Sequence, residues 1–285
     1  MIKLKINNET DKLRAVILGL PPLIPENPSR HDDLTERDIK QSYEMLVFKN
    51  ALESNNITVY RPERIFGMEN KIQIFTRDIG FVIGNYFIKS NMRYPDRAIE
   101  YETIKKITAK IDEDKILTPP YDADIEGGDV ILWNKYIFVG ISARTNMRGY
   151  EFIKETFKDR EVIPLKINLS SDPSRNILHL DCTFQPVGKK HAIIYEEGFD
   201  CDMDPIYDLF KNKNLIRISK EEQNILATNV LSINEQTIIS GKLAKWVNNE
   251  LKRLGFVVIE VPYYNVSRCG GSFRCSTLPL IRGQN

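Results

Sequence analysis

A thiol stands directly after a stretch with little steric bulk near the end of the 285-residue chain, in the run Arg274-Cys275-Ser276-Thr277-Leu278. The preceding Gly270 and Gly271 allow a ligand to approach the backbone closely. Cysteine thiolates are strong nucleophiles, but a lone cysteine is more often a small buried apolar residue. Whether Cys275 does chemistry therefore depends on the acid–base groups that the rest of the chain supplies.

Carboxylates and one imidazole occur in three short motifs: Arg77-Asp78, Glu126-Gly127-Gly128-Asp129 and His179-Leu180-Asp181. Each motif also has a purely structural interpretation. Asp78 could cap a turn, Glu126 could be a loop acid, and His179 could be a core residue. However, His179 and Asp181 would face one side of an extended strand. A thiol, an imidazole and several carboxylates together suit covalent attack on a cationic substrate.

The elements that must position these residues form a repeat. Four pairs of strand-like runs are each joined by a short polar turn, and the turns recur about every 50 residues. Asn and Gly at such tips suit the positive φ of tight hairpins. The turns lie at Gly84-Asn85, Asn134-Lys135, Gly188-Lys189 and Asn234-Glu235.

Helical stretches at 149–160 and 241–255 follow two of these hairpins, and each leads into a strand, at 161–167 or 256–262. The unit therefore reads ββαβ, and a fifth copy would join 275–281 to 14–20. We expect an α/β fold, a five-bladed α/β propeller of ββαβ repeats with pseudo-fivefold symmetry, formed by residues 1–285 as a single catalytic domain. An ordinary α+β sheet with coincidental spacing is the alternative. In a ring, Asp78, Glu126, His179, Asp181 and Cys275 would converge on one pocket.

Composition excludes several other classes of protein. The 40 Lys and Arg nearly balance the 39 Asp and Glu, without long blocks of one sign, so nucleic acid and anionic membranes are not expected partners. The first residues carry no apolar signal region, and no apolar run is long enough to span a membrane. The four cysteines form no zinc-type or disulfide pattern, so we expect no metal, no cofactor and a cytoplasmic location. The oligomeric state is not readable from the sequence.

The chain resembles the guanidine-modifying enzymes of the pentein fold, the five-bladed α/β propeller that includes arginine deiminase, dimethylarginine dimethylaminohydrolase and the amidinotransferases. Five segments carry this resemblance in the order of that superfamily, and all five together are specific. They are Phe75-Thr76-Arg77-Asp78, Glu126-Gly127-Gly128-Asp129-Val130, Ser142-Ala143-Arg144-Thr145-Asn146 with Gly149, His179-Leu180-Asp181, and Gly270-Gly271 through Cys275-Ser276-Thr277-Leu278-Pro279.

The resemblance implies a small-molecule guanidino substrate and a role for each residue. Cys275 would be the nucleophile, His179 the acid and base, and Glu126 the partner that orients His179 or contacts the substrate. Asp78 and Asp181 would bind the guanidinium N–H groups with charge-assisted hydrogen bonds.

Several arginines are candidates for binding a substrate carboxylate. We rank Arg144 first because it lies in a matched segment, and Arg93 and Arg274 are further candidates. Arg93 and Arg97 read as solvated charges of a loop that could cover the site. We expect Cys182 and Cys201 to be inert.

The expected reaction is hydrolysis of the guanidinium C–N bond of arginine or a close derivative, including methylated arginine. His179-Leu180-Asp181 is similar to the deiminase and amidinotransferase pattern, and a second carboxylate suits an unsubstituted guanidinium. The chain has little room for the helical insertion of arginine deiminases, which instead favours the dimethylarginine hydrolases. An amidinotransferase, in which an amine resolves the intermediate, is the alternative. A non-catalytic pentein that serves as a binding module is a minor one.

Overall fold

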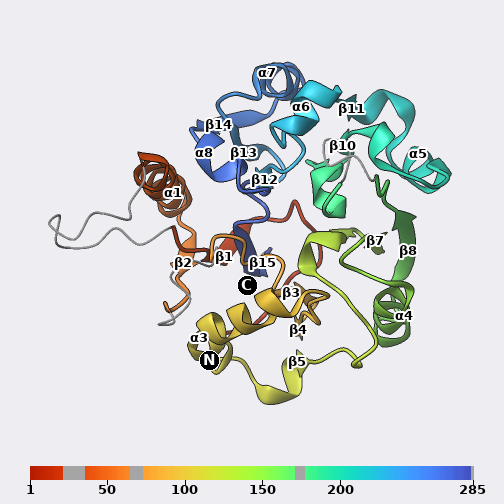
Figure 1. The fold of residues 1–285 in the computed structure, drawn as a ribbon. Coiled ribbons are helices and arrows are strands. Elements are labelled where there is room, and N and C mark those ends of the chain that lie inside the picture. The colour runs from red at the N-terminus through yellow and green to blue at the C-terminus, as the bar shows by residue number, and fades with distance from the viewer. Residues whose placement is uncertain (22–35, 65–72, 171–176, 284–285) are drawn as a thin grey trace, which may run out of the picture.

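Five three-stranded sheets dominate the computed structural model, which describes residues 1–21, 36–64, 73–170 and 177–283. In each sheet an antiparallel pair of strands is followed by a third, parallel strand, with helix between them. The predicted ββαβ unit is therefore confirmed five times within the described residues. Figure 1 shows the sheets arranged around a common centre, with α1, α4, α5 and α7 on the outside.

We number the sheets from the one that contains β3. The first two carry the segments 78–83 and 126–133. The first comprises β3 (Gly80–Ile83), β4 (Tyr86–Lys89), α2 (Pro95–Ala98), η2 (Ile99–Ile104), α3 (Lys105–Thr108), η3 (Glu113–Lys115) and β5 (Ile116–Leu117). The second comprises η4 (Gly127–Asp129), β6 (Val130–Trp133), β7 (Tyr136–Ile141), α4 (Met147–Thr156) and β8 (Glu161–Lys166).

The next two sheets repeat the pattern. The third comprises η5 (Leu180–Cys182), β9 (Phe184–Val187), β10 (His191–Ile194), η6 (Glu196–Gly198), α5 (Asp204–Phe210), η7 (Asn212–Asn214) and β11 (Leu215–Arg217). The fourth comprises α6 (Lys220–Asn224), β12 (Leu231–Ser232), β13 (Thr237–Gly241), α7 (Lys245–Arg253) and β14 (Val257–Val261), with α8 (Tyr264–Ser267) after it.

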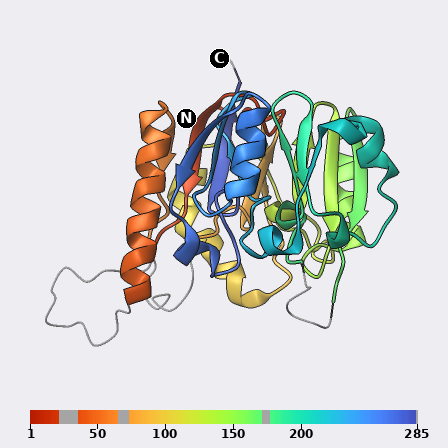
Figure 2. The same cartoon turned by 90° about the horizontal axis from the view of Figure 1, so that it is seen from above.

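The fifth sheet joins the two ends of the chain, as the sequence predicts. It comprises β15 (Thr277–Arg282), β1 (Leu13–Leu18), α1 (Glu36–Ser54) and β2 (Thr58–Tyr60). β15 pairs antiparallel with β1, so that Pro279 lies opposite Val16, and β1 pairs parallel with β2. Figure 2 shows α1 at one edge of the molecule, outside this sheet. Cys275 is thus held two residues before a strand that is paired with the beginning of the chain.

The backbone conformation of the hairpin turns explains why their positions could be predicted from the sequence. Gly84, Asn134 and Gly188 have φ angles of 60°, 53° and 61°, the left-handed conformation that Gly and Asn tolerate best. The fourth turn uses another device: the side chain of Asn234 accepts hydrogen bonds of 2.8 Å from the backbone N–H groups of Gln236 and Thr237.

Apolar side chains pack between neighbouring sheets and fix their spacing. Phe138 of β7 meets Phe184 of β9 edge to face, with ring centroids 5.3 Å apart. Phe48 of α1 packs in the same manner on Phe273, in the turn before Cys275, at 5.0 Å. No helix of the described ranges is both long and apolar enough to cross a membrane.

Candidate active site

The segments that precede the first strand of each sheet meet near the centre of the molecule. Hydrogen bonds link them successively: Gly127 N–H to Asp78 O, Leu180 N–H to the Asp129 carboxylate, the Asn229 amide to Asp181 O, Arg274 N–H to Asn229 O, and Arg77 N–H to Cys275 O. Five segments far apart in the sequence are therefore tied together, and each contributes a polar side chain to the same region.

A tight turn presents Cys275, whose side chain is only 2% exposed. Ser276 N–H and the Ser276 hydroxyl both donate to Ser272 O, at 3.0 and 2.9 Å, which closes the turn. A Cβ at Gly271 would lie 2.6 Å from the Phe75 ring and 2.9 Å from Cys275 Cβ. Gly271 therefore has a steric reason, because a larger residue would displace Phe75 or the thiol, whereas Gly270 has a φ angle of 99°, which favours glycine.

The side-chain amide of Asn229 holds Cys275 at two points. Asn229 Nδ2 donates to Cys275 Sγ at 3.1 Å, and Asn229 Oδ1 accepts from the Cys275 backbone N–H at 3.1 Å. Asn229 is fully buried and lies shortly before β12, as Asp78 lies shortly before β3. No side chain of the fourth repeat was predicted to reach the site, although the position before the hairpin was a signal that could have identified Asn229.

Asp181 lies beside the thiol and is neutralised from the other side. Its two carboxylate oxygens are 3.5 and 3.7 Å from Cys275 Sγ, and Oδ2 accepts from Arg274 Nη1 at 2.9 Å. Arg274 also donates to Glu9 at 2.8 Å and to Val130 O at 2.6 Å. Burial opposes ionisation of Glu9, but the attraction of Arg274 outweighs it and lowers the pKa of Glu9 to about 2.

The position of Arg274 does not suit the expected role of binding a substrate carboxylate. Its guanidinium is fully buried, and it bridges Glu9 to Asp181 instead of facing an open space. A buried cation of this kind compensates the charge of buried carboxylates. We assign it the role of holding Asp181 in place.

His179 contacts two carboxylates and is fully buried. Its Nε2 lies 2.9 Å from Glu126 Oε2, and its Nδ1 lies 3.8 Å from Asp78 Oδ1. A Cβ at Gly128 would approach the imidazole ring to 2.7 Å, so this glycine makes room for it. Burial disfavours the imidazolium, but the nearby carboxylates, Asp78 foremost, outweigh burial and raise the pKa of His179 well above its ordinary value. The surrounding carboxylates therefore favour the imidazolium form of His179.

The candidate arginines lie at different depths. Arg144 Nη1 is 3.6 Å from Glu126 Oε1, and its guanidinium lies over the Tyr94 ring at 4.4 Å. Arg93, in contrast, is paired with Asp124 at 2.9 Å, and 59% of its side chain is exposed. The structure brings Arg144 to the site and leaves Arg93 outside it.

Arg97, read from the sequence as a solvated loop charge, reaches Asp78. Its Nη1 donates to Asp78 Oδ2 at 2.6 Å, and two further nitrogens bind the Glu100 carboxylate, each at 2.8 Å. Burial opposes ionisation of Asp78, but His179 and Arg97 outweigh it, so the pKa of Asp78 is lowered. No local pattern indicates this contact, because it depends on where α2, which carries Arg97, packs in the folded chain.

Several buried polar atoms at the centre have no hydrogen-bond partner. They are Asp78 Oδ1, Glu126 Oε1, His179 Nδ1 and Arg144 Nη1. Buried polar groups are normally paired, and two of these atoms are carboxylate oxygens. The arrangement offers acceptors to a planar cation that carries several N–H groups.

Asp129 supports this centre without facing it. It accepts from the Ser142 hydroxyl at 2.7 Å and from Leu180 N–H at 2.9 Å, which ties the second sheet to the third. Burial raises the pKa of Asp129 to about 6.

Two groups of buried side chains have ligand atoms within 4.8 Å of one another, a spacing that a metal ion could use: Asp78, Glu126 and His179, and Asp181, Cys182 and Cys275. In each group an arginine already neutralises one carboxylate, Arg97 on Asp78 and Arg274 on Asp181. The two groups together are better matched to an organic cation.

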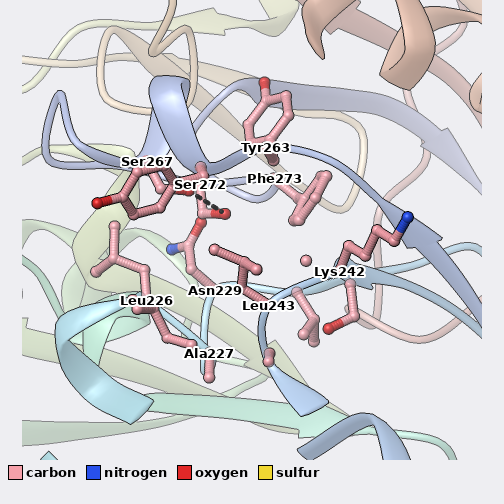
Figure 3. Close-up of a pocket in the computed structure, with 15 residues that line it drawn as sticks. Leu226, Ala227, Asn229, Lys242, Leu243, Tyr263, Ser267, Ser272 and Phe273 are labelled. Atoms are coloured by element: carbon pink, nitrogen blue, oxygen red, sulfur yellow. Dashed lines mark hydrogen bonds between the residues drawn. The ribbon is translucent and has the colours of Figure 1, made fainter. Parts of the chain in front are cut away.

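A small cavity of about 30 Å³ lies beside the turn that presents Cys275, between the fourth sheet and α8 (Figure 3). Leu226, Leu243 and Phe273 form part of its apolar wall, and Lys242 lies at its edge. Ser267 and Ser272 are hydrogen-bonded to each other at 3.2 Å on one side of it. Asn229 lines this cavity and also contacts the Cys275 sulfur, so the cavity adjoins the thiol.

The family model for N,N dimethylarginine dimethylhydrolase, eukaryotic, matches residues 27–282, which include every candidate residue named so far except Glu9. The chain belongs to this family. A Bacillus subtilis relative, the uncharacterized protein YkgA, is 37% identical over 234 residues, covering 82% of this chain and 78% of that protein. The resemblance to the pentein enzymes read from the motifs is confirmed.

Other similar proteins have different names within the same superfamily. An arginine deiminase of Bacillus cereus is 26% identical over 250 residues, which cover 73% of this dimethylhydrolase-family chain and 61% of the deiminase. Among solved structures, SxtG, an amidinotransferase of Microseira wollei, has a TM-score of 0.81 at 19% identity and covers 99% of this chain and 98% of its own. That likeness establishes the α/β fold of these enzymes.

Proposed function

We propose that this protein hydrolyses a guanidinium C–N bond of arginine or a methylated arginine through a covalent intermediate on Cys275. The observation that carries the proposal is the set of buried groups around the thiol: Asp181 at 3.5 Å from the sulfur, and His179 between Glu126 and Asp78. A guanidinium is planar and cationic, and these carboxylates match its charge and its N–H groups.

The resting enzyme would hold Cys275 as a thiol and His179 as an imidazolium. A hydrogen bond with Cys182, burial and the Asp181 charge all raise the pKa of Cys275 well above its ordinary value. A substrate cation placed beside the sulfur offsets the Asp181 charge and favours the thiolate. The nucleophile is then formed mainly when its target is bound.

The thiolate attacks the central guanidinium carbon, and a tetrahedral adduct forms. His179 donates a proton to the departing nitrogen, which leaves as ammonia or a methylated amine, and a thiouronium remains on Cys275. Neutral His179 then takes a proton from water, whose oxygen attacks the same carbon. Collapse of the second adduct releases the ureido product and regenerates the thiol.

Transfer of the amidino group to an amine is the second candidate, supported by the similarity in fold to SxtG, an amidinotransferase. The same side chains would form the intermediate, and an amine would take the place of water. The match to a hydrolase family favours hydrolysis.

We also infer that the five sheets are blades of a closed propeller with pseudo-fivefold symmetry, and that 1–285 is a single catalytic domain without a cofactor. The successive hydrogen bonds between the five central segments support closure. The four cysteines are unpaired, as expected in a reducing compartment such as the cytoplasm.

A panel of guanidino compounds tests the function directly. Arginine, monomethylarginine and dimethylarginine are incubated with the protein, with and without an amine acceptor. Ureido product together with released amine supports hydrolysis. An amidinated acceptor without ureido product supports transfer, and absence of both rejects the proposal.

A further inference from the structure

Cys182, which the sequence analysis left as inert, lies next to the proposed nucleophile. It follows Asp181 in η5 and is 2% exposed. Its Sγ is 3.6 Å from Asp181 Oδ1, and Cys275 Sγ is 3.7 Å from the same oxygen. The two sulfur atoms and a carboxylate oxygen of Asp181 all lie within 4.8 Å of one another. One carboxylate thus contacts two thiols from different sheets.

We propose that Cys182 is a resolving thiol, which forms a reversible disulfide with Cys275 when a hydroperoxide oxidises Cys275. The disulfide would stop turnover and protect the nucleophile from irreversible oxidation. This regulation rests on the proposed function of Cys275, but the chemistry of the thiol pair is measurable without it.

The steps balance with one equivalent of hydrogen peroxide. The Cys275 thiolate attacks one peroxide oxygen, the O–O bond breaks, and the sulfenic acid and hydroxide form; the hydroxide takes up the proton that the Cys275 thiol lost, which gives water. The Cys182 sulfur then attacks the sulfenyl sulfur, hydroxide leaves, and the proton lost by Cys182 completes a second water. Asp181, at 3.6 Å from Cys182 Sγ, is placed to accept that proton. A dithiol reductant reverses the reaction by exchange.

The geometry favours Cys182 over the other cysteines as the partner. A disulfide has an S–S bond of about 2.05 Å, and the two sulfurs lie within 4.8 Å of each other, so the bond requires a movement of at least one of the two side chains. The Cys269 thiol instead lies against α1, where Gln41 Nε2 contacts it at 3.0 Å. Cys201 is exposed, after η6.

Protonation of Cys275 sets the rate of the first step. Because the pKa of Cys275 is raised by its hydrogen bond with Cys182, by burial and by Asp181, attack on peroxide is slow at neutral pH and accelerates as the pH rises. The resting thiol is protected, whereas oxidation that does occur is captured by Cys182.

Tryptic mapping after peroxide treatment tests the pairing. Cleavage places Cys182 in peptide 176–189, Cys201 in 191–211, Cys269 in 269–274 and Cys275 in 275–282, so each linkage is unambiguous. The full-length protein is treated with hydrogen peroxide at pH 7 and pH 9, remaining thiols are alkylated, and half of each sample is first reduced with dithiothreitol. We expect peptides 176–189 and 275–282 to be linked, with faster linkage at pH 9, and dithiothreitol to restore most of the activity.

Cys182→Ser and Cys201→Ser are the matched variants. Each variant is compared with its own untreated sample: Cys182→Ser should accumulate sulfinic acid on 275–282 and lose recovery by dithiothreitol, whereas Cys201→Ser should behave as wild type. Linkage of 275–282 to 269–274, or full recovery in Cys182→Ser, overturns the proposal. If the protein turns over none of the guanidino compounds yet the 182–275 disulfide forms, the proposed function fails and the thiol pair stands.

Discussion

Asn229 and Cys275 form a two-point contact, in which one amide side chain binds both the sulfur and the backbone N–H of the proposed nucleophile, each at 3.1 Å. The donated N–H points at the atom that must become negative. A hydrogen bond to a charged group is stronger than one between neutral groups. Asn229 is therefore a positioning residue whose amide favours the thiolate.

Asn229→Ala should slow turnover by about 10- to 150-fold, because a contact to the thiolate worth roughly 1.5–3 kcal/mol is lost. The decisive readout is the pH dependence of iodoacetamide alkylation of peptide 275–282, which should move to higher pH. Asn229→Asp should move it further, since a carboxylate repels the thiolate. An unchanged alkylation profile in both folded variants contradicts the role.

Cys275→Ser should abolish turnover, because a serine hydroxyl without strong activation is a poor nucleophile toward a cation. Cys269→Ser is the matched control and should leave most activity, since that thiol lies against α1. Mass spectrometry of acid-quenched wild type should find the adduct on peptide 275–282. Full activity in Cys275→Ser would reject the covalent mechanism.

Asp129→Asn should change how stability depends on pH. The pKa of Asp129 rises from 3.8 to about 6 on folding, chiefly through burial. The folded state therefore binds the proton more tightly, and the stabilisation present below pH 3.8 is lost as the pH rises through about 6, by about 3 kcal/mol in total.

Asn keeps the acceptor for Leu180 N–H but cannot ionise. The difference in unfolding free energy between Asp129→Asn and wild type should therefore grow in favour of the variant between about pH 4 and 6. Urea unfolding at a series of pH values measures it. A difference that stays flat across this window would show that Asp129 does not titrate there.

Arg144→Ala should raise KM for arginine by roughly 10- to 150-fold if Arg144 binds the substrate carboxylate. Agmatine, which lacks that carboxylate, should be affected far less. Arg93→Ala is the control, because Arg93 is mostly exposed and paired with Asp124. Equal losses on both substrates would instead mean that Arg144 acts only through its contact with Glu126.

The fold was largely predictable because the signals are local. Gly84, Asn134 and Gly188 stand where positive φ is required, and the hairpins around them follow from their own residues. Convergence of Asp78, Glu126 and His179 then follows from their equivalent places in the repeat.

The contacts of Arg97, Arg274 and Cys182 were not predictable in this manner. Arg97 reaches Asp78 only because α2 packs beside it, and Arg274 is neutralised by Glu9, from the opposite end of the chain. Cys182 is brought to Cys275 because η5 and the turn before β15 meet at the centre of the molecule. Such pairs are set by tertiary structure, and no local pattern marks them.

The last prediction concerns Asp181 and the choice of substrate. One of its oxygens binds Arg274 at 2.9 Å, while the other lies near both thiols, so it has limited capacity for further N–H groups. If the substrate guanidinium is unsubstituted, its terminal N–H groups would pair with this carboxylate. Asp181→Ala should then cost about 1.5–3 kcal/mol, roughly 10- to 150-fold in kcat/KM for arginine.

The same variant should discriminate less against N-methylated arginines, because methyl groups no longer meet a buried carboxylate. Asp181→Asn is the companion variant, since it keeps the volume and removes the charge that Arg274 neutralises. The measurement is kcat/KM for arginine, monomethylarginine and dimethylarginine in wild type and both variants. If wild type already prefers dimethylarginine to arginine, the interpretation of His179-Leu180-Asp181 as a site for an unsubstituted guanidinium is wrong. Asp181 would then serve to hold Arg274 and to set the protonation of Cys275, and both variants should lower the pH at which Cys275 is alkylated.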